Sequence, residues 1–588
     1  MPDATPSPTV PRVPRWPLGV VFVCALGLRI AVHLEVADGP IPRLHRYGES
    51  DMAFHHAQAE RLSQGDWLQR GPFHPCHAWH RDVARAHFLA SPTARERYAS
   101  APDPAVALWD DWYGGPRFHQ EPLYPYLVAI GYAWLGADPG WMIVLQLLVG
   151  AASQVLVFAM ARRHAGASAA WVTVVLSLAY APTMAHELVL LRTAIEVFLG
   201  LATVALADRA RAAEGTRAWL LVGAVAGIAT ACRAPLALLA LCVGLLAARA
   251  GARRAAAYAA GVALALAPVA ARNVAVGAPI ASLSSVAAVT FACQNVPGVD
   301  PLGGFTVDAP AVAAAMGAGD GAFLAAVRAS WARHPDAGSI AWMLAGRARA
   351  LVASREIAGN TSVELARRES PVLAACPIGF GAIAALAAVG LALGMGRARC
   401  PWPLVALMVA ATVPQLAFYV TSRFRSPLAL ALLPCAGAGV IALVSAGRAR
   451  RWRRLVGACA LSGAIGIAAH TAPDERHLAA AELATAYEVH HLPAWEAARA
   501  RGDHAEAIAL AVRALELGAR ELAALDASTG SLADDARDHA RLALGWTMRL
   551  ASSRATAGDA TGANAALDAA ARLEARLARS DAPDPRDR

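Results

Sequence analysis

The stretch GWMIVLQLLVGAASQVLVFAMARR, residues 140–163, decides the fold class of this chain. Residues 140–161 carry no charge, and about 20 apolar residues are enough for a helix to cross a bilayer. Arg162 and Arg163 follow directly, and such arginine clusters mark the cytoplasmic end of a span. The stretch therefore predicts a membrane span that ends in the cytoplasm.

The composition extends this interpretation to the whole chain. Of the 588 residues, 57% are hydrophobic and 16% are charged, and the mean hydropathy is +0.40. A soluble domain carries about a quarter charged residues, and a disordered chain has few apolar ones. All 53 basic residues are arginine, and they flank apolar stretches, so we expect no nucleic-acid partner. We expect an all-α polytopic membrane protein surrounded by membrane lipids.

The apolar stretches predict eleven spanning helices. They lie near residues 16–34, 140–161, 168–184, 188–207, 217–232, 235–249, 255–271, 373–394, 401–420, 427–446 and 455–471. With a cytoplasmic N-terminus, six arginine clusters share the cytoplasmic side, at Arg12/Arg15, Arg162/Arg163, Arg209/Arg211/Arg217, Arg249/Arg253/Arg254, Arg397/Arg399 and Arg448–Arg454. The segment 123–135 is too short to span and is expected to be interfacial or re-entrant on the outer surface.

These spans divide the chain into three parts. We expect a cytoplasmic tail over 1–15, a transmembrane catalytic domain over 16–471 and an extracytoplasmic helical domain over 472–588. Two large loops of the transmembrane domain, 35–139 and 272–371, then face outward. In the last part, 498–517 and 554–573 show alanine and leucine at helical spacing near a Gly-Asp turn. They resemble tetratricopeptide helix pairs, with a generic helical hairpin bundle as the alternative, and the surface could bind a protein partner.

The first outer loop contains the main candidate for chemistry. From Asp51 onward, Ala53, Ala57 and Leu62 share one helical stripe, so Asp51 lies at a helix start. The helix dipole keeps a carboxylate there ionised, and an ionised Asp at the membrane surface can act as a general base. The alternative is that Asp51 is only an N-cap.

The order of several segments resembles a known superfamily. After the helix that starts at Asp51 come EPLYPYLVA (121–129), VLQLLVGAASQ (144–154), GIATACRAPLALL (227–239), APVAARNVAVGAPI (267–280), SSVAAVTFACQN (284–295) and FYVTSRFRSPLALALLP (418–434). Over roughly residues 16–445 this resembles the GT-C polyprenyl-phosphate-sugar glycosyltransferases, in particular family 39, the protein mannosyltransferase and aminoarabinose transferase group. The resemblance implies an undecaprenyl- or dolichyl-phosphate sugar donor, inversion at the anomeric carbon and a catalytic Asp at position 51. Asn295 loosely matches an Asn that the family often has near the donor.

Polar residues at the outer ends of the predicted spans are candidates for binding the donor. Arg192 and Glu196 are four apart in one predicted span and can pair, either for function or as a structural ion pair. Guanidinium groups bind phosphate bidentately, and snorkelling of these arginines to the surface is the alternative. The candidate substrate-binding residues are His119, Glu121, Glu187, Arg192, Arg272, Asn273, Asn295, Arg423 and Arg425. Arg233 is a weaker candidate, and Arg29 is expected to snorkel or to pair locally.

Metal binding is weakly indicated. His74, His77 and His80 in HPCHAWH have a spacing that could ligate a transition metal, but Pro75 breaks a helix there and no partner set is evident. The sequence therefore requires no cofactor, although a divalent metal is compatible with it. Cys76 and Cys293 both face an oxidising compartment and could form a disulfide.

The sequence thus predicts a multi-pass glycosyltransferase of the bacterial inner membrane. It would move a sugar from a polyprenyl-phosphate donor to a protein, lipid or glycan acceptor on the outer face, with Asp51 as general base. One alternative is a polysaccharide polymerase or ligase, which would accept long chains. The other is a lipid-linked sugar flippase or transporter without chemistry, which the odd span count disfavours.

Overall fold

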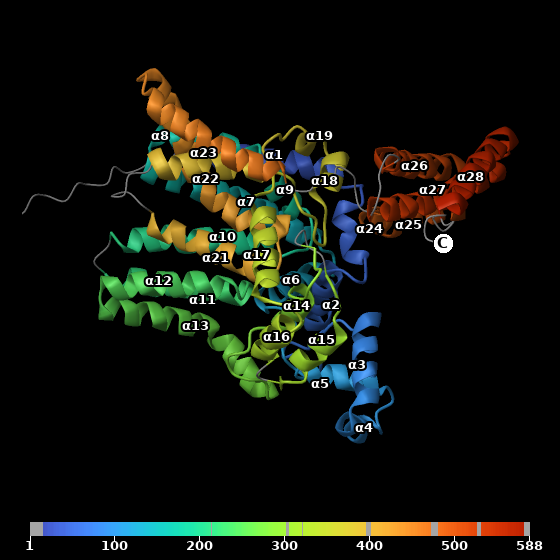
Figure 1. Cartoon of the computed structure of the whole chain (residues 1–588), viewed down its shortest axis with the longest axis horizontal. Coiled ribbons are helices and arrows are strands. Elements are labelled where there is room, and N and C mark those ends of the chain that lie inside the picture. The colour runs from blue at the N-terminus through green and yellow to red at the C-terminus, as the bar shows by residue number, and fades with distance from the viewer. Residues whose placement is uncertain are drawn as a thin grey trace, which may run out of the picture.

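The computed structural model describes residues 16–212, 215–300, 305–319, 322–394, 401–471, 480–525 and 531–580. These ranges are helical and contain no strand, so the predicted all-α class is confirmed (Figure 1). The predicted tail 1–15 and the arginines at positions 12, 15, 397 and 399 lie outside the described residues. Within the described ranges, the structure has a bundle of apolar helices, a layer of shorter helices at one end of it, and a group of C-terminal helices beyond that layer (Figure 1).

The helices of the bundle follow the predicted spans closely. They are α1 (Trp16–Val36), α7 (Gly140–Ala165), α8 (Ala167–Leu178), α9 (Ala181–Glu187), α10 (Thr193–Ala210), α11 (Thr216–Cys232), α12 (Leu236–Ala250), α13 (Ala252–Val276), α20 (Phe380–Val389) with a π-helical end (Gly390–Gly394), α21 (Trp402–Ala417), α22 (Ser422–Arg448) and α23 (Trp452–His470). In the described part of the chain, four helices, α1, α7, α13 and α22, are long and apolar enough to cross a membrane by themselves. The count of eleven spans therefore stays a prediction.

One predicted span, 168–184, is broken in the structure. α8 and α9 meet at an angle of 57°, and the pair is long and apolar enough to count as one bent span. Pro182 lies in the first turn of α9, where its missing N–H costs no helical hydrogen bond. The chain between α9 and α10 is irregular, so Glu187 ends α9 and α10 begins at Thr193, five residues after the start of the predicted span 188–207.

Small residues allow two neighbouring helices to approach closely. A Cβ atom added at Gly223 of α11 would lie 2.0 Å from the carbonyl oxygen of Tyr258, and one at Gly261 of α13 would lie 2.1 Å from that of Leu220. Helices in membranes associate through such close contacts, because lipid provides no hydrophobic drive between them. These two glycines therefore fix the packing of α11 on α13.

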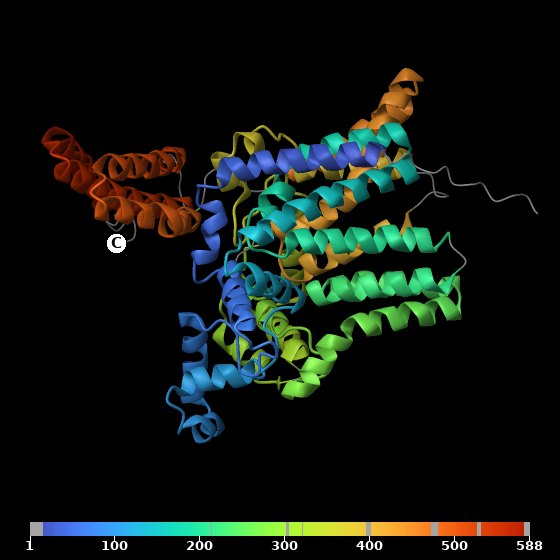
Figure 2. The same ribbon diagram turned by 180° about the vertical axis from the view of Figure 1, so that it is seen from behind.

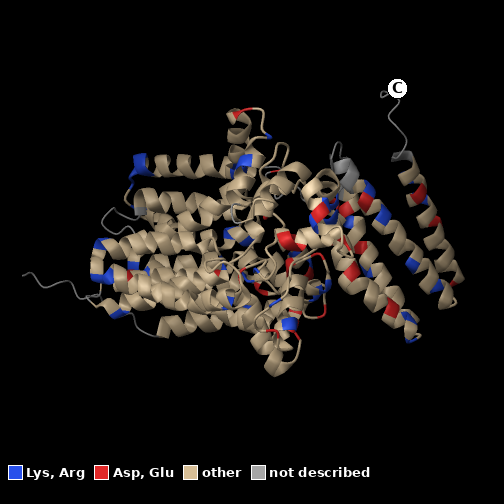
Figure 3. Cartoon of the chain, turned by 90° about the horizontal axis from the view of Figure 1, so that it is seen from below, with Lys and Arg blue, Asp and Glu red and all other residues tan. Residues whose placement is uncertain are grey.

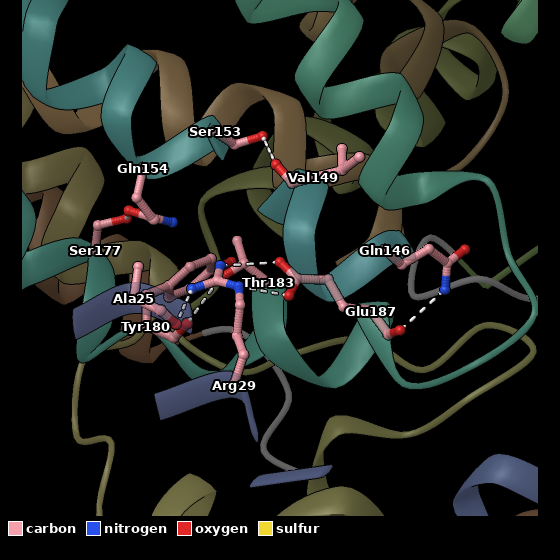
Figure 4. Close-up of polar contacts among 10 residues, drawn as sticks. All are labelled: Ala25, Arg29, Gln146, Val149, Ser153, Gln154, Ser177, Tyr180, Thr183 and Glu187. Atoms are coloured by element: carbon pink, nitrogen blue, oxygen red, sulfur yellow. Dashed lines mark hydrogen bonds and ion pairs between the residues drawn. The ribbon is translucent and has the colours of Figure 1, made fainter. Parts of the chain in front are cut away.

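A buried ion pair joins the first helix to α9. Arg29 of α1 donates from Nε and Nη2 to the carboxylate of Glu187, at 2.6 and 2.9 Å, in the fork arrangement that Figure 4 shows. Arg29 is 1% exposed, so it neither snorkels nor pairs locally as predicted. Gln146 of α7 donates to the backbone oxygens of Glu187 and Val189, which holds the end of α9 against α7.

The layer at one end of the bundle consists of short helices from the two predicted outer loops. They are η1 (Ile41–Arg46), α2 (Asp51–Ser63), α3 (Ala78–Ala90), α4 (Pro92–Tyr98), α5 (Pro104–Trp112), α6 (Leu123–Leu135), α14 (Val286–Gln294), α15 (Ala309–Met316), α16 (Ala322–Trp331), α17 (Ala337–Val352), α18 (Val363–Glu369) and α19 (Pro371–Ala374). α6 covers the predicted short segment with 13 residues and packs against α2 (Figure 2). The two loops therefore form one layer that covers one end of the apolar helices.

The C-terminal helices are α24 (Ala480–Ala486) with a π-helical continuation (Tyr487–His491), α25 (Leu492–Ala500), α26 (His504–Leu525), α27 (Ser531–Thr556) and α28 (Ala560–Ser580). Tight corners at Gly502 and Gly558, both with positive φ, join α25 to α26 and α27 to α28. Both predicted stretches are therefore helix–turn–helix corners, while their tetratricopeptide character stays a prediction. Figure 3 shows arginines at the end of the apolar bundle that lies away from the C-terminal helices, and it shows more acidic residues toward those helices.

Candidate active site

Asp51 occupies the first position of α2, but it is not the cap of that helix. The N-cap is Ser50, whose hydroxyl oxygen accepts the backbone N–H of Ala53 at 3.1 Å. Because Ser50 takes this role, the Asp51 carboxylate is not used for capping. The alternative that Asp51 is only an N-cap is therefore wrong.

Three side chains from distant parts of the chain bind the Asp51 carboxylate. Arg423 of α22 pairs with Oδ2 at 2.9 Å, and Gln120, just before α6, donates to Oδ1 at 2.7 Å. Asn360, from the loop before α18, donates its Nδ2 to Oδ2 and accepts the Asp51 backbone N–H at 3.3 Å. The side chain of Asp51 keeps 26% of its surface exposed, so it remains accessible while it is held at three points.

The surroundings keep Asp51 ionised and the nearby histidines neutral. Burial acts to raise the pKa of Asp51, but Arg423, His55 and Arg192 together hold that pKa well below its usual range. Burial, reinforced by Arg192, lowers the pKa of His55 to about 3. Burial also lowers the pKa of His119 to about 3, even though Asp51 acts to raise it. Asp51 is therefore an anion beside neutral imidazoles at physiological pH.

A cavity of about 570 Å³ opens beside Asp51. Its size falls in the usual range for small-molecule sites. Asp51, His119, Gln120 and Glu121 line it from the outer layer, and Arg423 and Phe424 line it from α22. Its apolar lining includes Leu236 of α12, Val413 and Pro414 of α21, Phe418 directly after α21, and residues of α14 and α16. The cavity thus lies where the outer layer meets the bundle helices, and both contribute polar and apolar lining.

Three arginines line this cavity, and each is paired with a carboxylate. Besides the Arg423–Asp51 pair, Arg192 contacts Glu121 at 2.9 Å, and Arg233 contacts Glu196 at 3.5 Å. The predicted pairing of Arg192 with Glu196 is therefore replaced by two pairs that cross between elements. Unpaired buried charges are costly, so these pairs hold the guanidinium groups in place. A guanidinium has five N–H donors, so each pair leaves donors for an anionic ligand.

Of the predicted binding residues, His119, Glu121, Arg192 and Arg423 line the cavity, whereas the other five lie elsewhere. Arg272 donates to the backbone oxygens of Leu68 and Gln69 at 2.8 and 2.7 Å and covers the ring of Phe118. Asn273 donates to the backbone oxygen of Ser282 at 2.7 Å. Both side chains connect the end of α13 to neighbouring loops.

The remaining three predicted residues are also engaged in structural contacts. Asn295 caps α14 and accepts from Arg347 at 2.8 Å. Arg425 is 0% exposed and binds the Ala353 backbone oxygen and the carboxylate of Glu356, each at 2.7 Å. The Glu187 carboxylate is bound to Arg29, as described above. The structure thus does not bring Asn295, Arg425 or Glu187 to the cavity.

A second cavity, of about 370 Å³, also borders Asp51. Asp51, His119 and Gln120 line both cavities, so the two cavities meet at these three residues. Phe54 and Phe73 add aromatic walls to the second cavity, and their ring centres are 5.2 Å apart. Asp51 can therefore be reached from two directions.

The histidines of the first loop are used in other contacts. His74 contacts Asp110 at 2.9 Å, and His80 accepts the backbone N–H of His77 at 3.0 Å. Among the residues that the structure describes, no three side chains gather into a group that could hold a metal ion. Cys76 and Cys293 are free thiols that belong to one hydrophobic cluster with Tyr113, so the disulfide that the sequence left open is not formed.

Gln120 and Asn360 carry no sequence signal of their own, and Arg233 is the weaker candidate named above. Gln120 stands directly before the segment EPLYPYLVA (121–129), and Arg233 lies two residues before Pro235, where a predicted span starts. Asn360 lies 309 residues from Asp51 in a short polar loop, and nothing in its local sequence links it to that helix. Only the fold brings these residues together.

One comparison with known proteins gave a match. Residues 119–273 match the family described as dolichyl-phosphate-mannose-protein mannosyltransferase. This segment is about a quarter of the chain and contains Glu121, Arg192, Glu196 and Arg233, but not Asp51 or Arg423. No curated protein and no solved structure matches the chain. Together with the apolar helical bundle, the family match supports a membrane glycosyltransferase of the GT-C type, the superfamily that the sequence resembles.

Proposed function

We propose that this protein transfers a sugar from a polyprenyl-phosphate donor to an acceptor on the outer face of the bacterial inner membrane, with inversion and with Asp51 as general base. The observation that carries this proposal is that an ionised Asp51 lines two neighbouring cavities. In this orientation the N-terminus is cytoplasmic, and the loops that hold Asp51 and the C-terminal domain are extracytoplasmic.

The larger cavity suits the donor. Its three arginines offer hydrogen-bond donors to a phosphate, and its apolar wall on α12 and α21 suits the first units of a polyprenyl chain. Since the arginines are already fixed by carboxylates, they are placed in advance for the charge that develops on the departing phosphate. The volume suits one sugar phosphate.

The smaller cavity suits the acceptor. A hydroxyl or amine that enters it reaches Asp51 through a cavity whose lining, in the described part of the chain, contains no arginine. Asp51 takes the proton of this group, and the freed oxygen or nitrogen attacks the anomeric carbon as the bond from that carbon to the phosphate oxygen breaks. The products are the glycosylated acceptor and the polyprenyl phosphate, which accepts hydrogen bonds from the arginines. Because Asp51 is now protonated, Arg423 no longer has a charged partner and can pair with the phosphate. Attack from the side opposite the leaving group inverts the anomeric centre.

Replacement of the carboxylate tests this proposal. Asp51→Asn keeps the shape of the side chain but removes the base, so transfer should fall at least about 100-fold. Outer-surface glycoconjugates are measured by mass spectrometry in cells that lack the gene and are complemented with the wild type or the variant. We expect a glycan that disappears on deletion, returns with the wild type and stays absent with Asp51→Asn.

The matched control is Glu60→Gln, which removes another carboxylate from the same helix. Glu60 is partly exposed and does not line the larger cavity. Among the described residues, it forms an ion pair with His56. This variant should restore the glycan fully. Wild-type product with Asp51→Asn would remove Asp51 from the mechanism, and translocation of a lipid-linked sugar with no glycosylated product would favour a flippase.

A further inference from the structure

Asn360 holds Asp51 at two points. Its amide nitrogen donates to the carboxylate Oδ2, and its amide oxygen accepts the backbone N–H of the same residue at 3.3 Å. The backbone of Asn360 has φ +58°, a left-handed conformation that Asn tolerates better than most residues. The turn therefore aims one amide at both the side chain and the main chain of Asp51.

The chain before Asn360 is anchored to α22. Arg425 binds the backbone oxygen of Ala353 and the carboxylate of Glu356, and Ser422 donates its N–H to the Ile357 oxygen at 2.8 Å. The same helix carries Arg423, which pairs with Asp51. The first half of this loop and the arginine of the site are thus fixed by one element.

The chain after Asn360 is anchored to the C-terminal helices. Only Thr361 and Ser362 separate Asn360 from α18, and the Ser362 hydroxyl caps that helix. At the other end of α18, Arg368 pairs with Glu521, and Glu369 pairs with Arg513 at 3.1 Å. The side chain of Glu521 is only 2% exposed, so its ion pair with Arg368 is well shielded from water.

We infer that Asn360 is a positioning residue for Asp51 and that the C-terminal domain, through α18, keeps it in place. This inference rests on the proposed function, because it assigns Asn360 to the orientation of the proposed base. The contacts with Arg423, Gln120 and Asn360 hold the Asp51 carboxylate in one orientation. Loss of one contact lets the carboxylate rotate away from the acceptor. The C-terminal domain then acts on the rate of transfer without a contact to Asp51.

Two substitutions at Asn360 test the positioning role. Asn360→Gly keeps the left-handed backbone and removes the amide, and Asn360→Asp keeps the shape but replaces the donor with a second negative charge. We expect the maximal rate of transfer to fall about tenfold with Gly and further with Asp, at an unchanged KM for the donor. In the Asp51→Asn background, Asn360→Asp should leave the residual rate unchanged. A purely structural role would lower the rate equally in both backgrounds.

A charge exchange in the full-length chain tests the link to the C-terminal domain. Arg368→Glu and Glu521→Arg each break the contact, whereas the double variant restores a pair of opposite charges. We expect each single variant to lower the maximal rate several-fold, and we expect the double variant to reach at least half of the wild-type maximal rate. The matched control exchanges Arg541 and Asp538, an exposed pair within α27, and should leave the rate unchanged.

The outcomes separate this inference from the proposed function. If Asp51→Asn abolishes transfer and the Asn360 variants keep the wild-type rate, the positioning role is wrong and the proposed function stands. If Asp51→Asn retains full activity, Asp51 is not the base. The proposed mechanism is then wrong, and the positioning role of Asn360, which rests on it, is wrong as well. If the Asn360 variants are slow but the charge exchange has no effect, Asn360 positions Asp51 without help from the C-terminal domain, and that half of the inference is overturned.

Discussion

Arg423 and Arg425 stand two positions apart on α22, yet they have different surroundings. Arg423 lines the larger cavity and pairs with the partly exposed Asp51. Arg425 points away from the cavity and binds two backbone oxygens and Glu356 in the interior. On a helix, residues i and i+2 face different directions. Arg423 therefore faces the cavity, while Arg425 makes structural contacts in the interior.

This difference predicts two distinct phenotypes. Arg423→Gln should lower transfer at least about tenfold and weaken donor binding, with an apparent Tm close to that of the wild type, because a charge-assisted contact to phosphate is lost. Arg425→Gln leaves Glu356 without its charge partner and should destabilise the fold by about 3 kcal/mol. Thermal unfolding of the purified protein and transfer assays on both variants check this. An unstable Arg423→Gln together with a stable, inactive Arg425→Gln would contradict the assignment.

At the scale of elements, the contact between α7 and α9 shows how a small residue makes room for a charge pair. A Cβ added at Gly150 of α7 would lie 2.2 Å from Oε1 of Glu187. The carboxylate that binds Arg29 therefore occupies the space that the missing side chain leaves. Three helices, α1, α7 and α9, depend on this one position.

Gly150→Ala should therefore destabilise the bundle. The added methyl group displaces Glu187 from Arg29, and a broken buried ion pair costs about 3–5 kcal/mol. The matched control is Gly27→Ala in α1, where an added Cβ meets nothing within 4 Å. That change should be neutral or stabilising by up to about 1 kcal/mol, since alanine favours a helix over glycine. Thermal unfolding in detergent measures both, and equal stabilities of the two variants would refute this account of Gly150.

At the scale of the whole molecule, the site and the C-terminal helices lie at the same end of the bundle, and arginines mark the other end (Figures 1 and 3). A single orientation in the membrane therefore places Asp51, both cavities and the C-terminal domain in one compartment. A polyprenyl-phosphate sugar on the outer leaflet can meet an acceptor only if that compartment is extracytoplasmic.

Topology reporters test this orientation. Alkaline phosphatase is active only outside the cytoplasm, so fusions within 35–139 and at the C-terminus should be active. Fusions after Arg211 and after Arg450 should be inactive, because those loops carry arginine clusters. Inactive fusions within 35–139 would place Asp51 in the cytoplasm and would exclude the proposed donor.

Much of the fold could be predicted from the sequence, and the reasons are local. The apolar stretches of α7, α13 and α22 have the length and arginine flanks of membrane helices, and the short segment at α6 is a separate helix of 13 residues. The stripe from Asp51 to Leu62 identified α2 and its start. The family match at 119–273 agrees with the resemblance that the ordered segments showed.

The partners of the charged residues could not be predicted in this way. Spacing along one helix suggested that Arg192 pairs with Glu196, but each found a partner on another element. Arg29 pairs across 158 residues, and Asn360 reaches Asp51 across 309. The spacing of apolar residues and the placement of arginines reflect how each helix by itself contacts lipid and water. The sequence by itself therefore determined the all-α membrane class, the main helices and the position of Asp51 at the start of α2. A buried charge takes whichever opposite charge the packed helices bring within reach, so only the tertiary structure decided which carboxylate each arginine meets and which residues line the cavities.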